Sequence, residues 1–170
     1  MIKKTITLFA ATMLLFAGCG GGYDIQNELS ELNNDNMKKL VTCYTSFQSQ
    51  NSQGGFMGPE SEEKFKEFLN GEGASKFLEY IGVDKAKIND LMISDRDGQP
   101  FKFRWNVQGA RRGSDEPVIF EAAGVDGKKM VGFTSFRFVE ATDQEYEDWF
   151  NGKYVPGSGV ENQGGRGSGR

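Results

Sequence analysis

Residues 101–107 read FKFRWNV, and this stretch marks the point where the chain changes from helical to extended patterning. Its apolar side chains alternate with polar ones, and they are Phe101, Phe103, Trp105 and Val107. Because successive side chains of a strand point to opposite faces, this alternation predicts a strand with one buried face. Most of the aromatic residues are therefore expected in the core and not in a surface cluster.

Upstream of this strand, apolar residues recur at the three- and four-residue spacing of helices. The predicted helices cover residues 24–50, 61–69 and 74–81, with one or two further turns after Asp84. The run from Asn33 to Asn36 weakens the first helix, because such side chains compete for backbone hydrogen bonds. That segment is either one long helix or two collinear helices. Residues 49–60 have the composition of a loop.

Downstream of residue 107, short strands follow one another and a helix closes the fold. The predicted strands cover residues 117–123, 129–133 and 136–140, and a turn at residues 124–127 joins the first two. Thr142 and Glu145 form a capping-box pattern that opens a helix ending near Phe150. The order predicts an α+β fold, with N-terminal helices packed on a roughly four-stranded antiparallel meander and a short C-terminal helix. Residues 155–170 are rich in glycine and are expected to be a disordered tail.

The first nineteen residues read MIKKTITLFAATMLLFAGC, a charged start and a short apolar run that end in small residues before Cys19. The apolar run is shorter than the ~20 residues that span a bilayer. The pattern resembles the lipobox signal of bacterial lipoproteins. That resemblance implies a signal peptide over residues 1–18, a covalent lipid on Cys19, a tether over residues 19–23 and one α+β domain over residues 24–154.

The lipoprotein resemblance also implies a location in the bacterial cell envelope. Gly20 follows the lipidated cysteine, which in Gram-negative lipoproteins indicates the periplasmic face of the outer membrane. Loss of Lys3 and Lys4 with the signal leaves 18 basic against 24 acidic residues, a formal charge of about −6. This charge argues against nucleic acid as a partner and leaves the lipid as the membrane contact.

The chain contains no histidine, which excludes Ser-His-Asp and Cys-His hydrolases and removes the commonest zinc ligand. No cofactor or metal is expected besides the lipid. Since Cys19 is taken by acylation, Cys43 has no partner for a disulfide. Its position near an apolar helix face predicts a buried thiol.

Three further segments resemble the globular domains of type II secretion pseudopilins and prepilin-like proteins. They are Asn36–Leu40 followed by Tyr44 and GGFMGPE, then residues 95–101, then residues 131–136. The resemblance implies the same α+β fold and no active-site residue. A lipobox stands where those proteins carry their hydrophobic assembly helix, so a filament subunit is not expected.

Three short patterns could carry chemistry. Ser61 and Lys64 match the S-x-x-K pattern of penicillin-binding enzymes, but a helix cap is favoured because the companion motifs are missing. Asp95 and Asp97 are weak candidates for a metal loop. A strand begins where the further ligands should lie, so a turn stabilised by aspartate is favoured.

The third pattern is the loop at residues 109–116, the predicted recognition loop, whose charged residues are Arg111, Arg112, Asp115 and Glu116. Arginine suits carboxylate or phosphate partners, and binding residues concentrate on loops. The alternative is a solvated connection whose charges compensate one another.

We therefore expect a membrane-anchored envelope lipoprotein that is not an enzyme and acts through contacts with an envelope protein. The alternative is a periplasmic ligand-binding or hydrolytic module that uses Asp95 and Asp97 or the two arginines of the loop.

Overall fold

The computed structural model describes residues 35–156. The predicted signal peptide, the lipid site at Cys19, the tether, residues 24–34 and the tail from residue 157 lie outside the described residues. Within the described range, no helix combines the length and the apolar character needed to cross a membrane.

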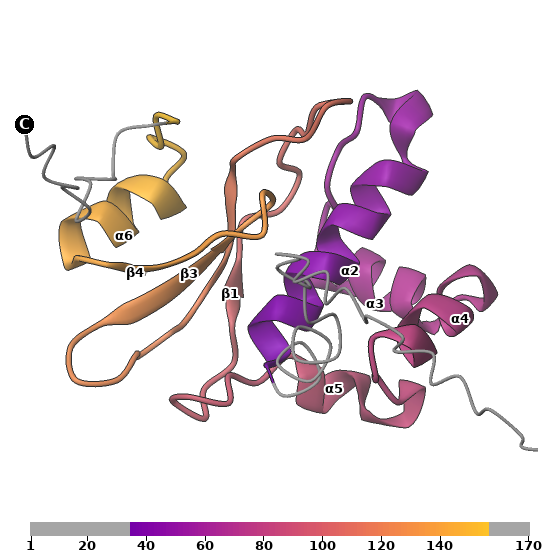
Figure 1. Cartoon of the computed structure of the whole chain (residues 1–170), viewed down its shortest axis with the longest axis horizontal. Coiled ribbons are helices and arrows are strands. Elements are labelled where there is room, and N and C mark those ends of the chain that lie inside the picture. Colours follow the sequence, from indigo (N-terminus) through magenta and orange to yellow (C-terminus); the bar gives the residue numbers. More distant parts are fainter. Residues whose placement is uncertain (1–34, 157–170) are drawn as a thin grey trace, which may run out of the picture.

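The described chain forms layers around a four-stranded sheet (Figure 1). Helix α2 (Asn36–Gln50) packs on one face of the sheet, and α6 (Asp143–Phe150) packs on the other. On the far side of α2 lie α3 (Glu62–Asn70), α4 (Glu72–Tyr80) and α5 (Ile88–Leu91), with 3-10 turns at Ser52–Gly54 (η1) and Lys85–Lys87 (η2).

The strands are β1 (Lys102–Phe103), β2 (Pro117–Phe120), β3 (Lys129–Phe133) and β4 (Phe138–Ala141). They pair antiparallel in the order β1-β2-β3-β4. This meander between N-terminal helices and a short C-terminal helix confirms the predicted α+β class.

Helix α2 begins at Asn36 because Asp35 is extended, with φ −128° and ψ 107°, and its side chain accepts a hydrogen bond from the Lys38 amide. Such a cap satisfies a backbone donor that has no partner inside the helix. Of the two alternatives left open, one long helix through residue 35 is therefore wrong, and a separate preceding helix would lie outside the described residues.

Strand β1 is much shorter than the predicted strand at residues 101–107. Asn106 has φ +57°, which ends the extended run, and its amide donates to the Pro59 carbonyl at 2.7 Å. The Gly58 amide donates to the Val107 carbonyl at 2.9 Å, and Met57 bridges to Gln108. Hence only the first half of this stretch pairs with the sheet, and the second half pairs with the loop after α2.

Two other strand boundaries differ from the prediction. Strand β2 ends at Phe120, before the predicted residue 123, although the Glu121 amide still donates to the Met130 carbonyl at 3.0 Å. Strand β4 begins at Phe138 and not at Phe136, because Phe136 has φ +62° and belongs to the preceding turn. By contrast, β3 spans the predicted residues.

Both faces of the sheet are covered, one by α2 and the other by α6. The α2 side is so close-packed that a Cβ on Gly132 would lie 2.8 Å from Val41 Cγ2. On the α6 side, Phe120 packs edge-on to Tyr146, and Phe133 packs edge-on to Trp149. These contacts confirm that most aromatic residues belong to the core.

Cys43 lies fully inside the α2 side of the core. Burial raises the pKa of its thiol to about 12. The predicted burial of this cysteine is confirmed.

Candidate functional site

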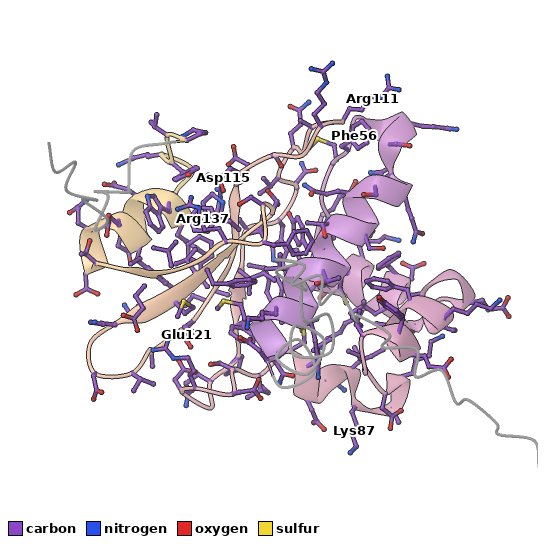
Figure 2. All side chains as sticks on the ribbon, in the orientation of Figure 1. Phe56, Lys87, Arg111, Asp115, Glu121 and Arg137 are labelled. Atoms are coloured by element: carbon purple, nitrogen blue, oxygen red, sulfur yellow. The ribbon has the colours of Figure 1, made fainter. Side chains whose placement is uncertain are left out.

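A groove of about 430 Å³ lies between the outer face of α2 and the loop at residues 109–114. The turn between β3 and β4 contributes its Thr134 and Phe136 to the same groove. Figure 2 shows Arg111 and Phe56 near one another at the C-terminal end of α2. We call this surface the Arg111 groove.

The α2 wall of the Arg111 groove is lined by hydroxyl groups. The hydroxyls of Thr42, Thr45 and Ser49 donate to backbone carbonyls one turn earlier in the helix, at 2.8, 3.0 and 2.9 Å. Each hydroxyl oxygen keeps lone pairs that can accept a hydrogen bond. The wall is therefore polar, uncharged and able to accept hydrogen bonds from a ligand.

Phe56, Phe77 and Phe136 contribute the apolar part of the groove, and Phe56 and Phe136 have left-handed backbone conformations. Phe56 has φ +59° and Phe136 has φ +62°. A bulky residue seldom adopts this conformation, which costs about 1–3 kcal/mol and concentrates at functional sites. Phe136 is nevertheless 53% exposed. Thus the fold holds a large apolar ring in solvent at the edge of the groove.

Hydrogen bonds hold both phenylalanine backbones in place. The Phe56 amide donates to the Asn51 carbonyl at 3.2 Å, and its carbonyl accepts from the Gly109 amide at 2.9 Å. The Phe136 amide donates to the Phe133 carbonyl at 2.9 Å and closes the β3–β4 turn. Both rings are therefore carried on defined turns.

Arg111 lies at the edge of the groove, is exposed, and forms no ion pair or side-chain hydrogen bond with any described residue. Arg112 is equally exposed and unpaired within residues 35–156, but it does not line the groove. The loop therefore offers one free guanidinium to a ligand in the groove and a second one beside it.

The two acids of the same loop pair with arginines outside the loop. Glu116 pairs with Arg104 at 3.5 Å, and Asp115 pairs with Arg137 at 2.9 Å. Within residues 35–156, the charges of the loop therefore do not pair with one another. Of the four charged residues predicted for recognition, the structure brings only Arg111 into the groove.

Asp115 fastens the base of the recognition loop. It accepts hydrogen bonds from the hydroxyls of Ser135 and Tyr154 and from the Arg137 guanidinium. Partial burial acts to raise the pKa of Asp115, but these hydrogen bonds and the charge of Arg137 outweigh it and hold the pKa below its usual value. The carboxylate stays ionised and ties the loop to the β3–β4 turn.

Asp95 and Asp97 do not converge on a common point. Asp95 accepts from the Asn36 amide at 2.7 Å, while Asp97 accepts from the Ala123 and Gly124 amides at 3.0 and 2.7 Å. Asp97 also accepts from the Gln99 amide at 3.0 Å, which confirms the predicted aspartate-stabilised turn. No group of three or more Cys, Asp or Glu residues within residues 35–156 is arranged to hold a metal ion.

Ser61 is the N-cap of α3, and its side chain accepts from the Lys64 amide at 3.3 Å. This confirms the capping role that the sequence favoured over the S-x-x-K pattern.

Most of the groove is not predicted from the sequence, because residues 49–60, which include Phe56, have the composition of a loop, and Phe136 lies in a predicted strand. A usable signal is the recurrence of Thr42, Thr45 and Ser49 at three- and four-residue spacing, which places these hydroxyls on one face of α2.

Comparisons with protein-family models, with curated proteins and with solved structures give no match for this chain.

Proposed function

We propose that this protein is a lipid-anchored protein of the bacterial cell envelope that binds a protein partner through the Arg111 groove and is not an enzyme. The observation that supports this function is the placement of one unpaired arginine beside two strained phenylalanines and a wall of hydroxyls. Arginine and aromatic residues contribute much of the binding energy at protein interfaces.

The chemistry of the groove favours an extended peptide segment that carries an acidic side chain next to an apolar one. Arg111 can bind a carboxylate through two parallel hydrogen bonds. Phe56 and Phe136 can cover an apolar side chain, and the α2 hydroxyls can accept hydrogen bonds from the peptide amides. A volume of about 430 Å³ accommodates a few side chains.

The anchor is proposed from the sequence of the first nineteen residues. Asp35 lies sixteen positions after Cys19, so an extended connection reaches at most about 55 Å. Lipidation of Cys19 would thus keep the folded domain close to the membrane surface, and Gly20 favours the periplasmic face of the outer membrane. Labelling of cells with a palmitate analogue should depend on Cys19. Labelling that persists in the Cys19→Ser variant contradicts the anchor.

The alternative, a hydrolytic or ligand-binding module based on Asp95 and Asp97, has less support. Their carboxylates accept hydrogen bonds from backbone amides of different segments and do not face one another across a cavity.

The groove can be tested with a library of random peptides selected on the full chain carrying Cys19→Ser. We expect enrichment of peptides that combine Asp or Glu with an aromatic or aliphatic residue. Arg111→Ala should weaken a selected peptide by about 10- to 30-fold, the effect of removing an interface arginine worth roughly 1.4–2 kcal/mol.

Arg112→Ala is the matched control, because Arg112 is exposed on the same loop but does not line the groove. It should leave the affinity within about twofold. Equal losses for the two variants, or selected peptides without acidic residues, would contradict the proposed site.

A further inference from the structure

Lys39, in the first turns of α2, is only 8% exposed, yet it forms no ion pair or side-chain hydrogen bond with any described residue. The stem of a lysine can be buried while its ammonium group stays in solvent. No fully buried side-chain nitrogen within residues 35–156 lacks a hydrogen-bond partner, so the unpaired ammonium of Lys39 reaches solvent, where a ligand can bind it.

Lys39 lines a hollow of about 240 Å³ between the start of α2 and the segment that runs from residue 82 through α5. Three other charged residues line the same hollow: Asp84, Lys87 and Asp90. Figure 2 shows Lys87 beside α5, at the end of the molecule where α2 begins. This hollow, the Lys39 pocket, lies away from the Arg111 groove.

The four charges around the Lys39 pocket do not neutralise one another. Neither lysine lies within 4.0 Å of either aspartate, and Lys87 has no ion pair with any other residue in the range 35–156. Asp84 accepts one hydrogen bond, from the Ala86 amide at 2.9 Å. The pocket thus presents two cations and two anions with space between them.

The walls of the pocket are held in place without using these charges. The Asn36 side-chain amide donates to the Asp90 carbonyl at 3.2 Å and to the Ile93 carbonyl at 3.0 Å, and so joins α5 to the start of α2. The Val83 amide donates to the Leu78 carbonyl at 2.8 Å and fixes the turn after α4. The charged side chains are therefore carried on a preformed scaffold.

We propose that the Lys39 pocket binds a small zwitterion that carries a phosphate ester and an ammonium group, of which phosphoethanolamine is the simplest example. The phosphate pairs with Lys39 and Lys87, and the ammonium pairs with Asp84 and Asp90. Lysine binds phosphate as a point charge. The pocket is smaller than the ~300–1,000 Å³ of pockets for drug-sized ligands, which suits a group of this size.

Two kinds of ligand carry a phosphate ester together with an ammonium group: the headgroup of a membrane phospholipid and the free, soluble compound. The headgroup source rests on the proposed lipid anchor. The pocket lies beside the first described residues, on the side of the domain to which the chain from Cys19 leads.

The test uses the full chain with Cys19→Ser, so that its result does not depend on lipidation. Isothermal titration calorimetry measures binding of free phosphoethanolamine, inorganic phosphate and ethanolamine. Sedimentation measures binding to phosphatidylethanolamine vesicles and to phosphatidylcholine vesicles. We expect phosphoethanolamine or phosphatidylethanolamine vesicles to bind more tightly than the separate fragments and than phosphatidylcholine.

Lys39→Met keeps the apolar stem and removes the charge, and it should lower the affinity at least tenfold. Asp90→Asn, at an exposed position, should weaken binding of the zwitterion and leave binding of inorganic phosphate unchanged. The control is Lys76→Met, an exposed lysine of α4 that does not line the pocket.

Binding of the free compound alone identifies a soluble ligand, and binding of vesicles alone identifies a headgroup. Equal binding of inorganic phosphate and phosphoethanolamine overturns the zwitterion assignment. An absence of all binding, or a folded Lys39→Met variant with unchanged affinity, overturns the site. Failure of palmitate labelling or of peptide selection overturns the proposed function and leaves this result standing.

Discussion

The Tyr44 hydroxyl of α2 donates a hydrogen bond to the Arg104 carbonyl at 2.8 Å. The same oxygen accepts a hydrogen bond from the Val107 amide at 3.4 Å. Burial raises the pKa of Tyr44, so its hydroxyl stays protonated and can act as the donor. One buried side chain thus satisfies two backbone groups at the point where the chain leaves the sheet.

Tyr44→Phe should lower the free energy of unfolding by about 1–3 kcal/mol, because it leaves the partly buried Arg104 carbonyl without its donor and the buried Val107 amide without its acceptor. Urea denaturation should show a lower midpoint with an unchanged slope. Tyr80→Phe is the control, since Tyr80 is 70% exposed, and it should change stability by less than about 0.5 kcal/mol. Equal effects of the two substitutions would contradict the assigned role of Tyr44.

Gly132→Ala should destabilise the protein by about 1–3 kcal/mol, because its Cβ would lie 2.8 Å from Val41 Cγ2 and 3.2 Å from Met37 Cγ. Gly73→Ala is the matched substitution. It lies in α4 with no atom within 4 Å of the new Cβ, and it should stabilise by about 0.5 kcal/mol. Thermal unfolding of both variants measures the difference. A neutral Gly132→Ala would mean that α2 does not pack this closely on β3.

Asp115→Asn should destabilise the protein by about 1 kcal/mol at pH 7, a modest value because the carboxylate is partly exposed. The pKa of Asp115 is lower in the folded state than its unfolded value of about 3.9. Its stabilising effect is therefore complete above about pH 5 and is lost as the pH falls through the folded pKa. Urea denaturation from pH 7 to pH 3 should show the two proteins converging. A constant difference down to pH 3 would argue against an ionised Asp115.

Glu121→Gln should destabilise the protein by about 2–3 kcal/mol. Glu121 is 1% exposed, and its carboxylate accepts from the Met130 amide at 2.7 Å and from the Ser94 hydroxyl at 3.3 Å. A glutamine replaces one of these acceptors with a donor. Glu140→Gln, at an exposed carboxylate paired with Lys128 at 3.0 Å, should lower the free energy of unfolding much less than Glu121→Gln in the same urea titration. A larger loss of stability for Glu140→Gln than for Glu121→Gln would show that Glu121 is not needed to hold β2 and β3 together.

Cys43 should not react with Ellman's reagent in the folded protein at pH 8, because its pKa of about 12 leaves almost no thiolate and its side chain is buried. The Cys19→Ser chain retains Cys43 as its single thiol. It should react fully in ~6 M guanidinium chloride, because this concentration unfolds even stable domains and exposes the thiol. Rapid reaction without denaturant would place Cys43 outside the core.

Local signals in the sequence were enough to predict the order of the helices and strands and several of their boundaries. Ser61 and Thr142 cap α3 and α6 as expected, because a cap depends on residues only three positions apart. The span of β3 and the burial of Cys43 follow from periodicity. Arg111 is one of four charged residues predicted for recognition, because arginine suits carboxylate or phosphate partners and binding residues concentrate on loops.

The tertiary structure decided where β1 and β4 stop and which residues share the Arg111 groove. Asn106 and Phe136 continue an extended pattern in the sequence, but hydrogen bonds to Pro59 and Phe133 hold them at positive φ. Phe56, Arg111 and Phe136 come from three separate segments. Periodicity and capping act over a few residues, whereas these contacts join positions up to 80 apart. Only the packing of α2 against the sheet brings them together.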